Sequence, residues 1–107
     1  MQVTVRFTVK NTGTRAGDEV AQLYLRDEVS SVVTPALQLK KFQRLALPVG
    51  QQQEVVFELT AEDLMLLNTN LKWVVEPGAF TVLIGASSED IRLQAQFNVA
   101  QKVENVQ

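Results

Sequence analysis

The sequence contains neither cysteine nor histidine. Without cysteine, the chain can form no disulfide bond and no thiolate metal site, so its fold must hold without covalent cross-links. Without histidine, it lacks the most common general base and the most common metal ligand. A chain of 107 residues with 46% hydrophobic residues can still fill the core of one domain. The composition therefore predicts one domain with few of the residue types that catalysis uses.

A concentrated charge of one sign and a long apolar run are also missing. The formal net charge is −2, and the ten lysines and arginines are scattered from Arg6 to Lys102. Nucleic-acid binding requires a concentrated basic surface, which this spread does not provide. No apolar stretch approaches the roughly 20 residues of a membrane-spanning helix. The sequence therefore predicts neither a nucleic-acid partner nor a membrane partner.

Alternation of apolar and polar residues is the dominant pattern. From Val3 to Val9 every second residue is apolar, and the alternation returns at residues 54–59 and 91–99. Successive side chains of a β-strand point to opposite faces, so the pattern indicates strands with one buried face. More apolar stretches, at residues 20–25, 37–47, 71–75 and 80–84, bring the expected number to about seven strands. Because Met1 leads directly into the first strand, we expect the chain to be part of something longer.

Turn residues separate these strands. Residues 76–78, Glu-Pro-Gly, favour a type II turn, in which proline fixes one φ angle and glycine takes a positive one. Other turns are expected at residues 11–13, 48–50 and 87–90. The pattern predicts an all-β fold, an immunoglobulin or fibronectin type III-like β-sandwich of about seven antiparallel strands in two sheets. We expect it to occupy residues 1–100, with a polar C-terminal tail at residues 101–107. A small closed barrel is the alternative.

One segment departs from the strand pattern. Residues 60–67 combine a threonine, two acidic residues and a run of apolar residues. Thr60 is a suitable helix N-cap, and Asp63 would then be the third helical residue, where a negative charge is favourable. We expect a short helical connector of about two turns, held by its leucines. The polar tail from Lys102 to Gln107 is expected to have no partner.

The acidic residues offer no clear catalytic or metal site. Eight of the twelve occur in adjacent pairs at residues 18–19, 27–28, 62–63 and 89–90, which lie in loops or at element ends. Glycosidase chemistry requires two carboxyl groups held across a cleft, which adjacent residues do not provide. We therefore interpret the pairs as solvated. A weak calcium site at residues 27–28 or 89–90 is the alternative, although no calcium-loop spacing supports it.

Nucleophile and phosphate motifs are absent as well. The serines at positions 30, 31, 87 and 88 have no histidine base and no Gly-x-Ser-x-Gly context. Residues 13–17, Gly-Thr-Arg-Ala-Gly, lack the Gly-Lys-Ser/Thr ending of a phosphate loop and precede a strand. We interpret them as a corner between two strands. No catalytic, cofactor-binding or metal-binding residue is predicted.

Some apolar residues exceed what one small core needs. Phe7, Phe57, Phe80 and Phe97 share the inward parity of their apolar neighbours, as do Ile91, Leu93, Ala95 and Val99. In residues 20–25, however, both faces of the strand are apolar, whereas a sandwich strand usually keeps one face in solvent. We expect a domain-docking face that includes Val20, Tyr24 and Trp73. The alternatives are a strand end folded under a loop, and a sugar- or partner-binding surface built from Tyr24, Phe42 and Trp73.

The ordered motifs resemble a known family. They begin with residues 11–13, Asn-Thr-Gly, continue with 17–20 and 22–24, Gly-Asp-Glu-Val and Gln-Leu-Tyr, and extend to about residue 99. Further matching positions are Asp27, Ser30, Ser31, Val32, Pro35, Leu39, Phe42, Leu47, Pro48, Gly50, Val55, Phe57, Leu59, Leu64, Trp73, residues 76–78, Phe80, Val82, Ile84, Gly85, Ser87, Ser88, Asp90 and Ile91. This order is similar to the fibronectin type III-like domain of glycoside hydrolase family 3. At position 41 the family often has glycine, so Lys41 is expected to alter a local bend.

The resemblance implies an accessory role. In that family the domain lies toward the C-terminus of β-glucosidases and β-xylosidases, and the catalytic residues belong to other domains. The resemblance therefore implies a non-catalytic domain whose partners are the catalytic domains of the same polypeptide, in a parent that is periplasmic or secreted by the habit of the family. The alternative function is an independent module that binds polysaccharide or a protein.

Overall fold

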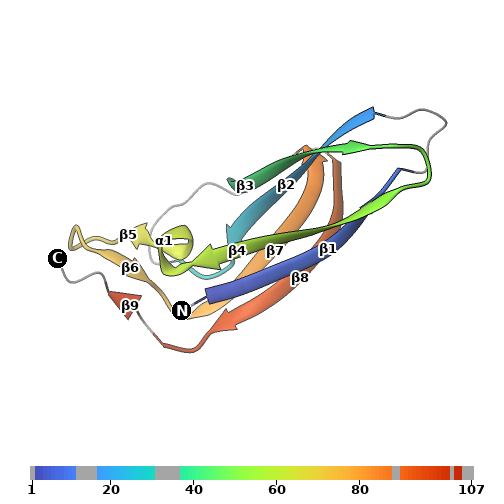
Figure 1. The fold of residues 1–107 in the computed structure, drawn as a ribbon. Coiled ribbons are helices and arrows are strands. Elements are labelled where there is room, and N and C mark those ends of the chain that lie inside the picture. Colours follow the sequence, from blue (N-terminus) through green and yellow to red (C-terminus); the bar gives the residue numbers. More distant parts are fainter. Residues whose placement is uncertain (1, 12–16, 31–36, 88–89, 102, 105–107) are drawn as a thin grey trace.

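Most of the described chain forms β-strands, as the alternating pattern predicts. The computed structural model describes residues 2–11, 17–30, 37–87, 90–101 and 103–104 (Figure 1). The long strands are β1 (Gln2–Lys10), β2 (Gly17–Asp27), β3 (Gln38–Leu47), β4 (Gln52–Thr60), β7 (Gly78–Ser87) and β8 (Asp90–Val99). The short elements are α1 (Ala61–Leu64), β5 (Leu66–Leu67), β6 (Trp73–Val75) and β9 (Val103–Glu104).

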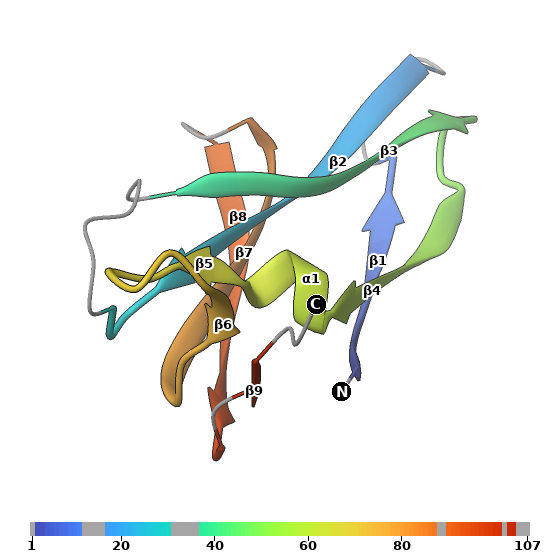
Figure 2. The ribbon, with the colours of Figure 1, turned by 90° about the vertical axis from the view of Figure 1, so that its left-hand side faces the viewer.

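The long strands form two antiparallel layers. In the described residues, β1 and β4 make a two-stranded sheet, and the order β3-β2-β7-β8 makes a four-stranded one. The short strands β5, β6 and β9 make a third sheet, which lies beside α1 at one end of the molecule (Figures 1 and 2). The expected sandwich is therefore confirmed, and the short end sheet raises the number of strands slightly above the expected seven.

The core lies between the two long sheets. Leu23, Leu45, Leu59 and Phe80 are among its fully buried side chains. Two aromatic pairs join neighbouring strands within each sheet. The ring centroids of Phe7 and Phe57 lie 5.8 Å apart, and those of Phe80 and Phe97 lie 5.5 Å apart. Phe57 and Phe80 are buried, whereas Phe7 and Phe97 are half-buried. The inward parity predicted for these four rings is thus consistent with their packing.

The parity of β8 correctly identifies its inner face but overestimates its burial. Leu93 pairs with Ile84 and Ala95 with Val82, two strand neighbours that belong to the core. Leu93 is nevertheless 49% exposed and Ala95 is exposed. The reason is that β8 lies at an edge of the wide sheet, where the two-stranded sheet does not cover it.

Two of the expected turns contain a glycine with a positive φ angle, but only one has the geometry of a type II turn. Gly50 has φ 78° and Gln51 N donates to Pro48 O at 3.1 Å, as in a type II turn. Gly78 also has a positive φ, but its value of 133° differs from the type II value of about 80°, and the residue begins β7. The type II turn expected at residues 76–78 is therefore wrong in type, although the need for glycine is confirmed.

The corner after β1 is held by its first residue. Asn11 Nδ2 donates to Leu47 O, and the Asn11 backbone N–H donates to Gln51 O, each at 2.9 Å. Residues 12–16, which complete the corner predicted at 13–17, lie outside the described residues. The contacts of Asn11 tie the end of β1 to the turn between β3 and β4.

The helical connector forms but is shorter than expected, because α1 ends at Leu64 and residues 66–67 form the strand β5. The Thr60 backbone N–H donates to Asp63 Oδ2 at 2.9 Å, which is one half of a capping box. Leu64 and Leu66 are buried and hold the connector against the sandwich.

Two expectations about the ends of the apolar stretches need correction. Leu71 was expected to begin a strand, but it lies in the turn before β6 with φ 59°. The tail was expected to have no partner, but Val103 pairs with Val75 in β9 and β6. Both corrections arise in the short end sheet, whose pairing brings together residues far apart in the sequence. The boundary predicted at residue 100 stays a prediction.

Candidate interaction surfaces

The acidic residues contact their own neighbours. Asp63 accepts from the Thr60 N–H and lies 3.5 Å from Lys41 Nζ, while Asp90 pairs with Arg92 Nη2 at 3.0 Å. Within the described residues, no group of three His, Cys, Asp or Glu side chains is arranged to bind a metal ion. The Asp18 side chain and Glu89 lie outside the described part of the chain.

In the described chain, no helix has the length and apolar character needed to cross a membrane.

The outer side of the four-stranded sheet carries the first candidate surface. In β2, Ala21, Leu23 and Leu25 point into the core, so Val20 and Tyr24 point outward, as predicted. Tyr24 is paired with Leu83 of β7 and with Leu39 of β3. Directly opposite residues of neighbouring strands share a face, so Leu39 and Leu83 lie beside Tyr24 on the outer side.

A β-bulge widens this surface. The register between β2 and β3 shifts at Leu23 and Tyr24, so that Tyr24 pairs with Leu39 and Gln22 pairs with Phe42. Leu39 and Phe42 are three positions apart and would face opposite sides of a regular strand. The bulge places both outward, where Leu39 is 50% and Phe42 is 70% exposed. We call Val20, Tyr24, Leu39, Phe42 and Leu83 the outer apolar face.

Polar contacts border the outer apolar face. The pairs Arg26–Thr81 and Thr81–Gln96 bring these three residues side by side across neighbouring strands. Thr81 Oγ1, which is buried, donates to Glu28 Oε1 at 3.1 Å and accepts from Gln96 Nε2 at 3.3 Å. Glu28 also accepts a hydrogen bond from Arg26. A satisfied polar network therefore borders the apolar residues at one end.

The pKa values of the neighbouring carboxyl groups of Asp27 and Glu28 are shifted in opposite directions. The hydrogen bond from Arg26, followed by that from Thr81, lowers the pKa of Glu28 below its ordinary value. Burial raises the pKa of Asp27, the nearby charges of Glu76 and Glu28 add to the rise, and the Val29 backbone N–H opposes it. The network therefore favours a charged Glu28, whereas burial disfavours a charged Asp27.

Trp73 lies on a different sheet from Val20 and Tyr24. It is in β6, directly opposite Leu67 of β5, and it is 53% exposed. Leu67 and Leu71 are also exposed, so the end sheet carries a second small apolar surface. The structure therefore brings two of the three predicted docking residues together and places the third elsewhere.

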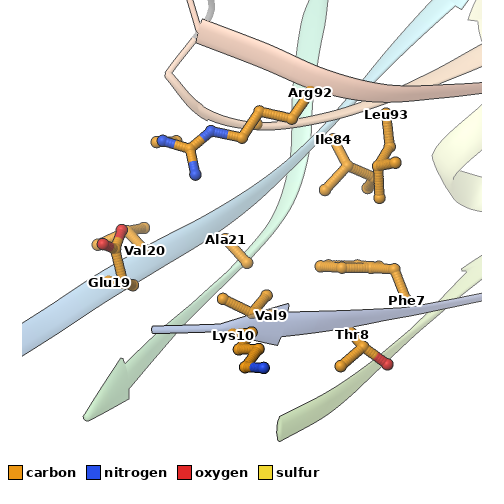
Figure 3. Close-up of a pocket in the computed structure, with 12 residues that line it drawn as sticks. Phe7, Thr8, Val9, Lys10, Glu19, Val20, Ala21, Ile84, Arg92 and Leu93 are labelled. Atoms are coloured by element: carbon orange, nitrogen blue, oxygen red, sulfur yellow. The ribbon is translucent and has the colours of Figure 1, made fainter. Parts of the chain in front are cut away.

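A groove between β1 and β8 is the third surface. A hollow of about 240 Å³ is lined mainly by apolar side chains, with Phe7 and Val9 on one side and Ile84 and Leu93 on the other (Figure 3). A second hollow of about 220 Å³ shares Phe7, Ile84 and Leu93 with the first, so the two adjoin each other. Arg92 lies at one end of the groove (Figure 3).

Comparison with known proteins identifies the family. The family model described as a fibronectin type III-like domain matches residues 19–88. The chain belongs to this family. A β-xylosidase of Formosa agariphila is 48% identical over 86 residues, which is 80% of this chain and 12% of that protein. A β-glucosidase of Bacteroides ovatus is 41% identical over 100 residues, or 92% of this chain and 13% of that protein.

Solved structures agree with the family assignment. The fibronectin type III-like domain superposes on β-glucosidase 3B of Thermotoga neapolitana with a TM-score of 0.92 at 36% identity, covering 97% of this chain and 14% of that one. A β-glucosidase of Listeria innocua gives 0.88 at 39% identity over 94% of this chain and 14% of that one. This chain thus spans only about an eighth of these relatives, in which the domain is part of a much longer polypeptide. The resemblance found in the sequence motifs is confirmed.

Sequence reasoning missed two residues of the outer apolar face. Leu39 was matched only as a family position, and Leu83 was counted in an apolar stretch without a face. The consecutive apolar residues from Val82 to Ile84 were the available signal, because a strand with both faces apolar is covered on both sides. For Leu39 there was no such signal, since a bulge does not show in the alternation.

Proposed function

We propose that this domain is a non-catalytic accessory domain of a larger glycoside hydrolase that acts on β-glucosides or β-xylosides. The names of its relatives support this activity for the parent protein, and the small share of each relative that the chain covers supports the accessory role. Its contribution is stability and assembly, because it packs against the catalytic domains of the same polypeptide.

The outer apolar face carries the proposal. Phe42 and Leu39 are 70% and 50% exposed although they adjoin Tyr24 and the buried Leu83. Covering one large apolar side chain contributes about 1.5–3 kcal/mol, so a neighbouring domain would gain substantially by packing here. The Trp73 surface on the end sheet is a second, separate contact in this proposal.

The experiment compares the isolated domain with the full-length protein. Phe42→Ser should leave the unfolding midpoint of the isolated domain nearly unchanged, because Phe42 is largely exposed there. In the full-length protein the same change should lower the midpoint and speed proteolytic release of the domain. The control is Val56→Ser, since Val56 is 38% exposed on the two-stranded sheet, away from the outer apolar face. Equal effects of Phe42→Ser in both proteins would contradict the proposal.

A carbohydrate-binding module is the second candidate, and Trp73 is the observation that favours it. Exposed aromatic rings are suited to stacking on sugars, and Trp73 is 53% exposed beside Leu67. Calorimetric titration of the isolated domain with cello- and xylo-oligosaccharides tests it. Binding that disappears in Trp73→Ala would support this candidate. If no heat of binding is detected, the accessory role remains as the only candidate function.

A further inference from the structure

Four of the long strands have a hydrogen-bonding edge that no other described strand occupies. They are β1 and β4 of the two-stranded sheet, and β3 and β8 at the two sides of the four-stranded sheet (Figure 1). Natural proteins use charged side chains, prolines, bulges or short strands to protect such edges from pairing. Three of the four strands carry charges of one sign: Arg6 and Lys10 in β1, Lys40, Lys41 and Arg44 in β3, and Glu54 and Glu58 in β4. Pairing any of these strands with a copy of itself would therefore bring like charges together.

The edge of β8 lacks this protection. Residues 93–99, Leu-Gln-Ala-Gln-Phe-Asn-Val, include no charged residue and no proline. They pair one to one with residues 78–84 of β7, and the register irregularities lie between Leu93 and the hairpin. The five consecutive residues 92–96 are all exposed. A regular stretch of seven residues is long enough for a full strand pairing, so this edge presents N–H and C=O groups to a partner strand.

The two faces of this stretch differ in chemistry. Its odd-numbered residues are apolar and lie on the side of the core, against which Phe97 and Val99 pack. Its even-numbered residues are Gln94, Gln96 and Asn98, and they face outward. An amide side chain both donates and accepts hydrogen bonds, so one amide can pair with another. The stretch is therefore complementary to a reversed copy of itself, with an apolar face and an amide face.

We propose that β8 pairs antiparallel with β8 of a second copy of this chain, so that two four-stranded sheets join into one continuous sheet. A two-fold axis beside Gln96 relates the copies, because this residue is the centre of the seven uncharged positions. On the inner side, Leu93 then lies opposite Val99 of the second copy. On the outer side, Gln94 lies opposite Asn98 of the second copy. No charged residue of this stretch meets another, unlike at the other three edges.

This pairing is compatible with the docking of the outer apolar face. Pairing at an edge extends the sheet within its own plane, so it leaves the outer apolar face uncovered. The inference goes beyond the proposed function and does not depend on it. One pair of strands is a small interface, so we expect a weak dimer whose population rises with the concentration of the chain.

The test measures association of the 107-residue chain over a range of concentrations. In sedimentation velocity, the average mass should rise with concentration toward that of two chains. Hydrogen exchange at the β8 amides that point away from β7 should slow about tenfold or more where the dimer predominates. A chain that stays monomeric up to about 1 mM, which corresponds to a binding free energy of only about 4 kcal/mol, would overturn the proposal.

Charged variants test the partner and the register. Gln94→Lys/Asn98→Lys places lysine opposite lysine at two positions of the dimer, and both residues are exposed, so the monomer should keep its fold. We expect this variant and Gln94→Glu/Asn98→Glu each to be monomeric, and an equal mixture of the two to associate again. The matched control is Thr4→Lys/Thr8→Lys, which adds the same charge at exposed positions of β1 and should leave the dimer unchanged.

Three outcomes would overturn the proposal. The first is a dimer that persists in Gln94→Lys/Asn98→Lys, and the second is a dimer that the Thr4→Lys/Thr8→Lys control weakens equally. The third is protection of the same β8 amides only in a monomeric full-length protein, which would assign this edge to another segment of that polypeptide.

Discussion

Gly85 shows how closely two backbones approach at one residue. It lies where the register between β7 and β8 shifts, next to the hairpin that joins them. A Cβ atom on Gly85 would stand 2.1 Å from the Asp90 carbonyl oxygen and 3.0 Å from Ile91 Cα. These are backbone atoms, so no side-chain rotation can make room.

Gly85→Ala is therefore expected to lower the free energy of unfolding by about 3 kcal/mol or more, since the hairpin backbone must move. Urea denaturation of the isolated chain measures this. The control is Gly17→Ala, because a Cβ on Gly17 meets nothing within 4 Å. Its free energy of unfolding should stay the same or rise by up to about 1 kcal/mol. A harmless Gly85→Ala would contradict the close approach.

Asp27 makes the stability depend on pH. Burial raises its pKa in the folded chain, so the folded state binds the proton more tightly than the unfolded state does. Its contribution therefore becomes unfavourable as the pH rises from the unfolded pKa through the folded one. Asp27→Asn keeps an acceptor for the Val29 N–H and should raise the free energy of unfolding at pH 7, by less than about 1 kcal/mol. The gain should shrink as the pH falls below about 4 and vanish below about pH 3, where the acid is protonated in both states.

Glu28, the next residue, affects the pH dependence of stability in the opposite direction. Its pKa is lowered, first by the hydrogen bond from Arg26, so its stabilising contribution exists above the unfolded pKa and is lost as the pH falls through the folded one. Glu28→Gln should therefore destabilise the domain at neutral pH, and the difference from the parent should shrink in acid. Denaturation of both variants and the parent at a series of pH values would test the two predictions. Changes of the same sign in the free energy of unfolding at neutral pH would contradict them.

At the scale of the element, the β5–β6 hairpin contains a strained residue. Asn68 N donates to Lys72 O at 2.9 Å, and Leu71 N donates to Asn68 O at 3.0 Å, so Leu71 is the last residue of a tight loop. Its φ of 59° is in the left-handed region, and its side chain is 78% exposed. Loops of this kind usually have glycine at that position.

Leu71→Gly should raise the free energy of unfolding by up to about 1 kcal/mol, because relief of the left-handed strain exceeds the entropy that glycine adds to the unfolded chain. Thermal denaturation of the isolated chain would show it. Leu71→Ala is the matched control, since it removes the same exposed side chain but keeps the strain. A gain of equal size in both variants would point to the side chain instead of the backbone.

The bulge in β3 shows why a prediction from the alternating pattern can assign a residue to the wrong face. One extra residue, Lys40, lies between the pairs Tyr24–Leu39 and Leu23–Lys41. The insertion reverses the parity of everything beyond it, so Leu39 and Phe42 lie on one face. The bulge lies beside Lys41, the position at which the family often has glycine and a local change of bend was expected.

For the whole molecule, burial separates structural aromatic residues from those available to a partner. Phe57 is 7% exposed and packs on Phe7, whereas Phe42 is 70% exposed on the outer apolar face. Phe57→Ala should cost about 3–5 kcal/mol of the free energy of unfolding, and Phe42→Ala less than about 0.5 kcal/mol. Denaturation of the isolated chain compares the two. A cost for Phe57→Ala below about 0.5 kcal/mol would contradict its place in the core.

The sequence by itself determined the class of fold, most of the core and the family. Alternation assigns side chains to two faces of a strand, and it correctly selected Val55, Phe57 and Leu59 as buried. The helix start at Thr60 and the need for glycine at positions 50 and 78 could also be predicted, because capping and positive φ depend on neighbouring residues alone.

Only the tertiary structure decided which faces are covered. The alternating pattern does not show how many strands lie opposite a given sheet. Leu93 is exposed because, in the described fold, a two-stranded sheet lies against a four-stranded one. The pattern also does not show which distant strands pair, so Trp73 was grouped with Tyr24 although the two belong to different sheets. The physical reason is that strand faces follow from local geometry, whereas burial follows from contacts between residues far apart in the chain.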